Sequence, residues 1–265
     1  MNKPDSFAGR VAIVTGAGSG IGTATVRQLV ARGAKVIATG RNMPALRATF
    51  EGDDQVEPVE LEVSDEAMWA RCVEGCMERH GRLDVLVNNA GISSTMPLLK
   101  TQLSDWRNVM GTNLDSIFFG TRQAVAAMLK GDKPPGNRGA IVNVSSVLGL
   151  VGTPNGAAYS ATKGAIRLFT KSVALEAAAS GWGIRVNSVH PGFIETTMLN
   201  RLLAERAETE KRPVEEFRGA LAARHPVNRL GQPDEVAAAI VFLASDAASF
   251  ITGVELAVDG GYTAQ

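Results

Sequence analysis

The chain has 265 residues, of which 45% are hydrophobic, and this length suffices for one large α/β domain or two small ones. Lys plus Arg and Asp plus Glu are equal at 27 each, so no overall field attracts nucleic acid or a membrane surface. The sequence has no basic block with interleaved aromatic residues, no stretch near the roughly 20 apolar residues of a membrane span, and no apolar signal-peptide core in its N-terminal MNKPDSFAGRVAIV. We expect a cytoplasmic protein that binds neither nucleic acid nor membrane.

Short β-branched runs alternate with amphipathic stretches along the chain, which is typical of a parallel sheet covered by helices on both faces. The turn-rich stretch 130–139 and the polar, helical stretch 195–226 interrupt this alternation. No repeat or linker marks a second domain, so we predict one domain over 1–265, a Rossmann-type doubly wound parallel sheet of seven strands. The expected strands are 10–15, 35–39, 56–63 (the weakest), 83–88, 140–145, 184–189 and 254–259, and the expected helices are 21–32, 65–80, 104–129, 157–179 and 234–244.

The first expected strand runs into TGAGSGIG at 15–22. Glycines at a strand-to-helix turn let the backbone approach a pyrophosphate, whose charge then lies at the helix N-terminus. Gly16, Gly20 and Gly22 follow a G-x-x-x-G-x-G spacing rather than G-x-G-x-x-G. A tight turn needs glycine for steric reasons in any case. The position of this turn, between the first strand and the first helix, indicates a dinucleotide site.

Cys72 and Cys76 are the only cysteines, and they lie four residues apart in an expected helix. Two ligands cannot complete a zinc site, so we interpret them as two buried thiols. This usage fits a reducing compartment.

The stretch YSATK at 159–163 places Tyr159 and Lys163 four residues apart, on one face of an expected helix. In isolation the two residues are an exposed surface pair or a proton-transfer device. A fixed ammonium next to a tyrosine stabilises the phenolate and lowers its pKa from the usual value of about 10. The other motifs have to decide between these interpretations.

Several motifs follow one another in a characteristic order. They are TGAGSGIG, NNAG at 88–91, Asn113 in TNLD, NVSS at 143–146, YSATK, HPG at 190–192 and the C-terminal VDGG. Together they strongly resemble the short-chain dehydrogenase/reductase family, from about residue 8 to the C-terminus. The tail VDGGYTAQ and the stretches NLDSIFFGTR and VHPGFIETTML are similar to bacterial secondary alcohol dehydrogenases of that family.

This resemblance implies a catalytic set of Asn113, Ser146, Tyr159 and Lys163. Tyr159 would exchange a proton with the substrate oxygen, and the Ser146 hydroxyl would donate a hydrogen bond that strengthens in the transition state. Lys163 would also bind the nicotinamide ribose, and Asn113 would hold a water that links the lysine to solvent. Of the adjacent pair Ser145 and Ser146, the spacing to the tyrosine favours Ser146.

The end of the second strand, TGRN at 39–42, governs the choice of cofactor. Gly40 occupies the position where an acidic residue would bind the adenosine ribose, and Arg41 follows it with a guanidinium that matches a phosphate. We therefore expect NADP(H) to be favoured over NAD(H). By resemblance, the cofactor contacts are Thr15, Gly16, Ser19, Gly20, Ile21, Gly22, Arg41, Glu62, Val63, Asn89, Ala90, Gly91, Tyr159, Lys163, Pro191, Gly192, Ile194 and Thr196.

The helical tract 195–226 is expected to cover the active site as a lid, with an apolar underside that includes Leu199 and Leu203. At helical spacing such residues serve core packing as often as a pocket. No charged group is placed to meet a substrate carboxylate or phosphate, which favours a neutral ketone or secondary alcohol. The expected substrate contacts are Ser146, Leu148, Tyr159, Phe193, Met198 and Leu202.

The family resemblance also implies a homotetramer, and in the similar alcohol dehydrogenases a structural Mg²⁺ lies near a C-terminal glutamine, here Gln265. Two other functions remain open. A 3-oxoacyl-thioester reductase of lipid synthesis uses the same catalytic residues and would need basic groups near the entrance, of which Lys211, Arg212 and Arg218 supply some. A non-catalytic NADP-binding sensor would not need the serine and the tyrosine.

Overall fold

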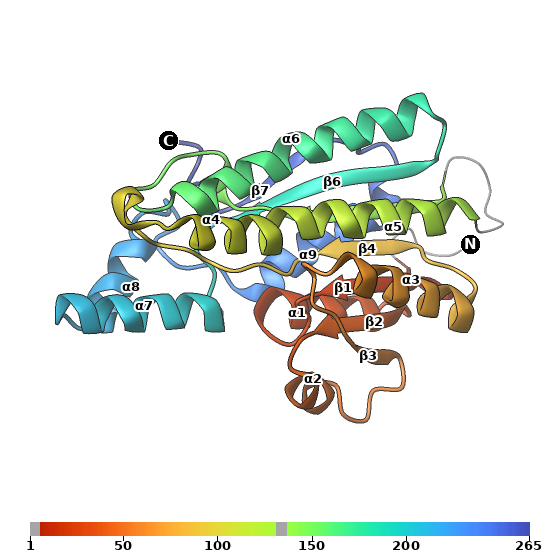
Figure 1. Ribbon diagram of the computed structural model, residues 1–265, viewed down its shortest axis with the longest axis horizontal. Coiled ribbons are helices and arrows are strands. Elements are labelled where there is room, and N and C mark those ends of the chain that lie inside the picture. The colour runs from red at the N-terminus through yellow and green to blue at the C-terminus, as the bar shows by residue number, and fades with distance from the viewer. Residues whose placement is uncertain (1–5, 131–136) are drawn as a thin grey trace.

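A seven-stranded parallel sheet forms the centre of the computed structural model, which describes residues 6–130 and 137–265. The strand order is β3-β2-β1-β4-β5-β6-β7, so the chain reverses its direction across the sheet between β1 and β4 (Figure 1). The strands are β1 (Val11–Thr15), β2 (Lys35–Gly40), β3 (Val56–Glu60), β4 (Val85–Asn88), β5 (Gly139–Val144), β6 (Ile184–Pro191) and β7 (Glu255–Val258). This arrangement confirms the fold class predicted from the sequence.

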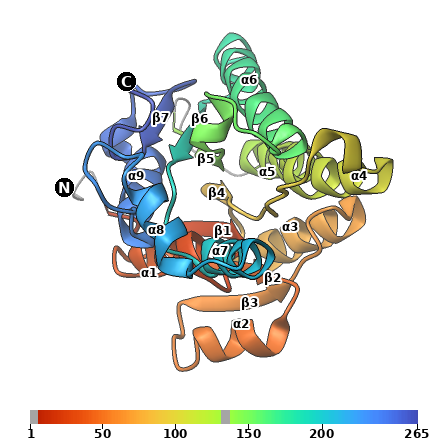
Figure 2. The same cartoon turned by 90° about the vertical axis from the view of Figure 1, so that its left-hand side faces the viewer.

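Helices cover both faces of the sheet (Figure 2). Helices α1 and α9 pack together on one face, and α3 and α5 pack together on the other, where α6 follows them. The helices are α1 (Gly20–Val30), α2 (Met43–Thr49), α3 (Glu66–His80), α4 (Leu103–Met110), α5 (Ser116–Lys130), α6 (Ala157–Ala179), α7 (Thr197–Glu210), α8 (Val214–Ala222) and α9 (Pro233–Ala244), with a π-helical segment at Gly111–Asp115 and short 3₁₀ turns at Leu98–Lys100, Val147–Gly149 and Asp246–Ala248.

Two hydrophobic clusters hold the layers together, one on each face of the sheet. On β1, whose residues are all buried, Val14 belongs to the cluster with α1 and α9, whereas Ile13 belongs to the cluster with α3 and α5. Successive side chains of a strand point to opposite faces, so a strand covered on both sides needs apolar residues at every position. This requirement explains the uninterrupted apolar runs in the sequence.

Most expected elements are present, with three differences. Helix α2 was missed because it is short, begins with the Met43-Pro44 pair and buries only Leu46. The expected helix 104–129 is divided by the π-helical segment, and the expected strand 56–63 ends at Glu60. Most of the predicted turn-rich connection 130–139 lies outside the described residues.

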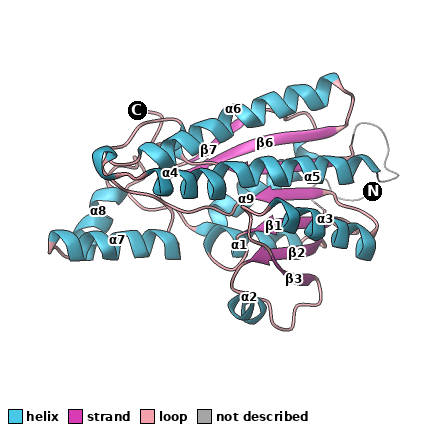
Figure 3. Cartoon of the chain, viewed as in Figure 1, coloured by secondary structure: helices cyan, strands magenta, loops and turns pink. Residues whose placement is uncertain are grey.

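The stretch 195–226 contains two helices and no strand, as expected. Helices α7 and α8 extend beyond the carboxyl ends of the strands (Figure 3), and they pack on each other through Leu199, Leu203 and Phe217. In open parallel sheets, ligands bind at the carboxyl edge where the strand order reverses. Within residues 6–130 and 137–265, no helix combines the length and apolar character that crossing a membrane requires.

Candidate active site

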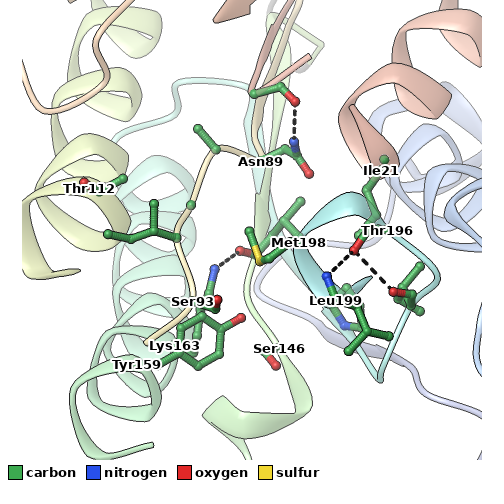
Figure 4. Close-up of a pocket in the computed structure, with 18 of the residues that line it drawn as sticks. Ile21, Asn89, Ser93, Thr112, Ser146, Tyr159, Lys163, Thr196, Met198 and Leu199 are labelled. Carbon is green, nitrogen blue, oxygen red and sulfur yellow. Dashed lines mark hydrogen bonds between the residues drawn. The ribbon is translucent and has the colours of Figure 1, made fainter. Parts of the chain in front are cut away.

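A cavity of about 340 Å³ lies at the carboxyl ends of the strands, beneath α7 (Figure 4). The sequence predicts most of its lining. Among the predicted residues, the lining includes Gly16, Ser19, Gly20, Ile21, Arg41, Glu62, Val63, Asn89, Ala90, Gly91, Ser146, Leu148, Tyr159, Lys163, Pro191, Gly192, Phe193, Ile194, Thr196, Met198 and Leu202.

The glycine-rich turn forms one end of the cavity with bare backbone. Gly16 and Gly20 have φ angles of +63° and +53°, a region that disfavours side chains. A Cβ atom at Gly20 would lie 2.9 Å from Thr196 Cγ2, and one at Gly16 would lie 3.0 Å from the Cα atom of Ala90. The turn leads directly into α1, whose N-terminal N–H groups and dipole suit an anion. This backbone cradle fits the pyrophosphate of a dinucleotide.

Thr15 and Gly22, both predicted as cofactor contacts, do not line the cavity. The Thr15 hydroxyl accepts hydrogen bonds from the backbone N–H groups of Asn89 and Ala90, at 3.0 Å each. A Cβ atom at Gly22 would lie 2.2 Å from the Gly16 carbonyl oxygen. These two residues therefore hold the turn and the NNAG segment in position, and their contact with a cofactor stays a prediction.

Tyr159 and Lys163 lie side by side on α6, and Ser146 lies just past the end of β5 (Figure 4). The Lys163 ammonium is 5.5 Å from the centre of the Tyr159 ring, and it donates a 2.9 Å hydrogen bond to the Val144 carbonyl. Burial lowers the pKa of Lys163 to about 8. Burial raises the pKa of Tyr159, and a hydrogen bond with Ser146 opposes this shift.

The two neighbouring serines have different surroundings. Ser145 donates a 2.8 Å hydrogen bond to the Lys163 carbonyl and so attaches the strand end to α6. Ser146 accepts a 3.1 Å bond from the Leu148 N–H, and its side chain lowers the pKa of Tyr159 against the effect of burial. Its backbone carbonyl accepts a 3.1 Å bond from Nδ1 of the fully buried His190. This geometry supports the preference for Ser146.

Asn113 lies inside the π-helical segment and is fully buried. Its amide exchanges two hydrogen bonds with the backbone of Ile92, accepting at 2.8 Å and donating at 2.9 Å. A Cβ atom at Gly91 would lie 3.2 Å from Asn113 Oδ1 and 3.7 Å from Lys163 Nζ, so both side chains flank the same stretch of backbone. The π-helical segment widens the turn at this point, as such segments frequently do at functional sites.

Arg41 and Glu62, two predicted cofactor contacts, are in contact with each other. The distance between Arg41 Nη1 and Glu62 Oε2 is 3.5 Å, and the Arg41 side chain keeps 69% of its surface exposed. Burial raises the pKa of Glu62, but hydrogen bonds from the Ser64 N–H and hydroxyl, together with the charge of Arg41, bring it below its usual value. The separation of the two residues in the sequence gives no indication of this ion pair.

Apolar side chains surround the end of the cavity next to Tyr159. Leu148, Phe193, Met198 and Leu202 all line it as predicted. Leu203, expected on the underside of the lid, instead packs against α8 and is 2% exposed. Phe193 is held by its backbone N–H, which donates to Nε2 of His225 at 3.2 Å.

The sequence analysis missed one coherent part of the lining, the loop that follows NNAG. Its position directly after a central strand was the available signal, because loops at the carboxyl edge of the sheet meet in one place. The further lining residues are Gly40, Leu61, Ile92, Ser93, Ser94, Thr95, Thr112, Val144, Ser145, Val147, Thr153, Gly156 and Leu199.

Gln265, the predicted magnesium ligand, donates from its amide nitrogen to the Arg224 carbonyl at 3.1 Å. Among the described residues, no group of three or more His, Cys, Asp or Glu side chains is arranged to hold a metal ion. The structure therefore lends no support to a magnesium site at this position.

Comparisons with known proteins agree with this geometry. A family model described as enoyl-(acyl carrier protein) reductase matches residues 16–263. An NADP-dependent (R)-specific alcohol dehydrogenase of Lentilactobacillus kefiri is 39% identical over 264 residues, which covers 98% of this chain and 99% of that protein. A 3-oxoacyl-[acyl-carrier-protein] reductase of Thermotoga maritima is 42% identical over 257 residues, covering 96% of this chain and 97% of that protein.

The solved structures include a ligand-free aldohexose dehydrogenase of Thermoplasma acidophilum. It superposes with a TM-score of 0.86 at 33% identity and covers 98% of this chain and 96% of its own. The family model and the relatives span nearly the whole chain. The chain therefore belongs to the short-chain dehydrogenase/reductase family of oxidoreductases.

Proposed function

We propose that the protein is an NADP-dependent carbonyl reductase or secondary alcohol dehydrogenase. The observation that carries this proposal is the meeting of Ser146, Tyr159 and Lys163 at the apolar end of one continuous cavity, whose other end holds Arg41. NADP(H), when bound, supplies or accepts the hydride. The residues of this chain position the substrate and move its proton.

Tyr159 acts as the general acid in ketone reduction and as the general base in alcohol oxidation. Its hydroxyl gives a proton to the substrate oxygen as negative charge builds up there, and Ser146 donates a hydrogen bond to the same oxygen. The position of both residues in the lining of one cavity supports this assignment, as does the influence of the Ser146 side chain on the pKa of Tyr159.

Lys163 keeps the tyrosine able to exchange its proton. Near neutral pH an ammonium with a pKa of about 8 is still mostly protonated, and a cation 5.5 Å from the ring favours the phenolate. Asn113 positions the backbone beside this lysine through its bonds to Ile92. We assign the role of the family's water-holding asparagine to Asn113.

Two observations support NADP(H) over NAD(H). Gly40 has no carboxylate to repel a 2′-phosphate, and Arg41 lines the same end of the cavity with an exposed guanidinium. The relative from Lentilactobacillus kefiri carries NADP dependence in its name.

The cavity also supports a neutral substrate. Among the described residues that line it, the charged ones are Arg41, Glu62 and Lys163, and the first two lie at the ends of β2 and β3, away from α6. The lining also includes the apolar side chains of Leu148, Phe193 and Met198 and uncharged hydroxyl groups such as that of Ser93, which lies beside Tyr159 in Figure 4. Such a surface favours a ketone or secondary alcohol without a carboxylate or phosphate.

A 3-oxoacyl-thioester reductase remains the second candidate, because a relative with that activity in its name is 42% identical. Carrier recognition would need available basic groups at the lid. Arg212 pairs with Glu216 at 2.8 Å, and Arg218 pairs with Glu195, so both are engaged within the lid itself. This pairing favours a reductase of free ketones over a reductase of carrier-bound thioesters.

The test is NADPH consumption against a panel of neutral aryl, cyclic and steroid ketones together with one acetoacetyl thioester. We expect turnover of ketones with NADPH and weaker turnover with NADH. Activity on the thioester alone would assign the protein to lipid synthesis. Tight NADPH binding with no turnover on the whole panel would instead favour a non-catalytic sensor.

A further inference from the structure

Arg41 and Glu62 form an ion pair in the cavity lining, and Arg41 is the residue to which the proposed function assigns the 2′-phosphate of NADP(H). We propose that Glu62 limits the preference for the phosphorylated cofactor, because its carboxylate competes for Arg41 and repels the 2′-phosphate. This inference rests on the proposed use of NADP(H). It assigns the strength of the cofactor preference to one acidic residue on the neighbouring strand.

The register of the sheet brings the two residues together. Strands β2 and β3 run parallel with Gly40 opposite Glu60, and the Leu61 N–H donates a 3.1 Å hydrogen bond to the Gly40 carbonyl. The residues that follow these strand ends therefore leave the sheet at the same edge. Arg41 and Glu62 consequently both line the cavity.

The carboxylate of Glu62 is held in place, whereas the guanidinium of Arg41 is not enclosed. Glu62 Oε1 accepts from the Ser64 N–H at 3.2 Å and from the Ser64 hydroxyl at 2.9 Å. Glu62 Oε2 is the atom that approaches Arg41, at 3.5 Å. The side chain of Glu62 is 35% exposed, compared with 69% for Arg41. Of the two partners, Arg41 is the one that can turn toward a ligand.

The lowered pKa of Glu62 keeps this carboxylate ionised at neutral pH. A phosphate that binds Arg41 therefore approaches a negative charge that is already fixed within contact distance of the same guanidinium. Part of the attraction by Arg41 is lost to this repulsion, and part is lost because the existing ion pair has to loosen. An NADH ribose carries no such charge and meets neither penalty.

The variant Glu62→Gln removes the charge while keeping an amide oxygen that can accept from Ser64. The matched control is Glu60→Gln, which removes the same charge two residues away, at an exposed position of β3 outside the cavity lining. Dissociation constants of NADPH and NADH are measured by titration calorimetry for the wild type and each variant. Adenosine 2′,5′-bisphosphate and adenosine 5′-monophosphate, which differ only in the 2′-phosphate, are measured in the same way.

In Glu62→Gln we expect the affinity ratio of NADPH to NADH, and of the bisphosphate to the monophosphate, to rise about fivefold, as expected from removing one nearby charge in a solvated site. Glu60→Gln should change either ratio less than about twofold, because solvent screens the more remote charge. High salt should reduce the effect of Glu62→Gln, since the repulsion is electrostatic. An unchanged ratio in Glu62→Gln would overturn the inference, and a lower ratio would show that Glu62 instead orients Arg41 for the phosphate.

Arg41→Ala separates this inference from the proposed cofactor. If Arg41→Ala leaves the ratio of NADPH to NADH unchanged, the assignment of NADP(H) through Arg41 fails. The effect of Glu62 is then judged only from Glu62→Gln, by the affinity ratio of the bisphosphate to the monophosphate. If this ratio does not increase, the inference about Glu62 is refuted. If Arg41→Ala lowers the ratio but Glu62→Gln does not raise it, the cofactor assignment holds and only the role of Glu62 is wrong.

Discussion

Lys163 combines burial with a charge that the proposed chemistry needs. Only 4% of its surface is exposed, and the hydrogen bond to the Val144 carbonyl compensates part of the cost of burying an ammonium. Burial lowers its pKa to about 8, which reflects the cost of burying the charged form. The side chain nevertheless stays mostly protonated at pH 7. Tyr159 shows the opposite shift, since burial raises its pKa. The Ser146 side chain opposes this upward shift, and the Lys163 ammonium lies 5.5 Å from the centre of the ring, where a cation favours the phenolate.

Tyr159→Phe removes the hydroxyl while keeping the ring that packs beside Lys163. We expect kcat to fall by at least about 100-fold, the lower end for loss of a general acid, with the dissociation constant of NADPH nearly unchanged. Steady-state kinetics and calorimetric titration measure the two quantities. Full turnover in this variant would refute the proton-transfer role.

Gly40→Asp should reverse the cofactor preference. A Cβ atom at this position would lie 3.8 Å from Leu46 Cδ2, an ordinary contact, so the side chain fits without strain. The new carboxylate would accept hydrogen bonds from the ribose hydroxyls and repel a 2′-phosphate, and we expect NADPH affinity to fall about tenfold relative to NADH. Gly40→Asn, of equal size and without charge, is the control. Retention of the NADPH preference in Gly40→Asp would contradict the placement of the phosphate at this strand end.

The adjacent residues Leu202 and Leu203 of helix α7 have different surroundings. Leu203 is buried in the cluster with Leu199, Phe217 and Leu230 and does not line the cavity, whereas Leu202 lines the cavity and packs against that cluster while only partly buried. The capping bond from the Leu199 N–H to the Thr196 hydroxyl fixes where the helix begins, and therefore which of its residues face the cavity. One turn of this helix thus contributes both to the substrate pocket and to the attachment of α7 on α8.

Truncating these two leucines should separate the two roles. Leu203→Ala is expected to lower the free energy of unfolding by about 2–4 kcal/mol, as for other buried leucines. Leu202→Ala should cost less stability but change KM for bulky ketones several-fold. Urea denaturation and a substrate panel measure the two effects. Equal loss of stability with unchanged KM in both variants would mean that Leu202 does not contact the substrate.

The two thiols of α3 should make stability fall at alkaline pH. Burial raises the pKa of Cys72 to about 11 and that of Cys76 to about 12, whereas unfolded thiols titrate near about 8.5. Above that pH the unfolded chain binds fewer protons than the folded one, so the free energy of unfolding decreases with rising pH.

The double variant Cys72→Ala/Cys76→Ala lacks both thiols and therefore this contribution to the pH dependence of stability. Its stability deficit relative to the wild type should therefore shrink by about 3–4 kcal/mol between pH 8 and pH 10. Urea denaturation of both proteins at several pH values measures the deficit. A deficit that stays constant with pH would contradict the raised pKa values.

The molecule as a whole has no net charge but leaves apolar side chains at its surface. On α6, which lies along the outside of the molecule in Figure 1, Leu168 and Leu175 are 64% and 72% exposed. They lie seven residues apart and so share one helix face. Phe118 on the neighbouring α5 is 45% exposed. Apolar residues grouped in this way are typical of surfaces that are covered in an assembly.

The family resemblance implies a homotetramer, and we expect its subunits to meet at this surface, so sedimentation analysis should give a mass of about four times the 27.9 kDa of one chain. Leu168→Glu/Leu175→Glu should shift the protein to smaller species, because a subunit interface does not readily bury two carboxylates. A monomeric wild type would refute the tetramer. Treatment with a chelator tests the structural magnesium separately. Unchanged oligomer size and activity would exclude a magnesium ion at Gln265.

Local patterns in the chain were sufficient for the sheet and the main helices, and the order of the motifs was sufficient to recognise the family. A strand covered on both faces needs a continuous apolar run, and the motifs from TGAGSGIG to YSATK occur in a fixed order, so both can be recognised without knowing any distance. Helix α2 is the counterexample, since seven residues that bury one leucine leave too weak a pattern.

Other properties depend on which residues meet in space. The supporting role of Thr15, the division of labour between Leu202 and Leu203, and the ion pair between Arg41 and Glu62 all follow from contacts between separate elements. Hydrophobic periodicity reports which face of an element is buried, but it carries no information on what that face touches. Those contacts arise only when the strands align in register and the helices pack across them, which is why the ion pair between Arg41 and Glu62 appeared only with the folded structure.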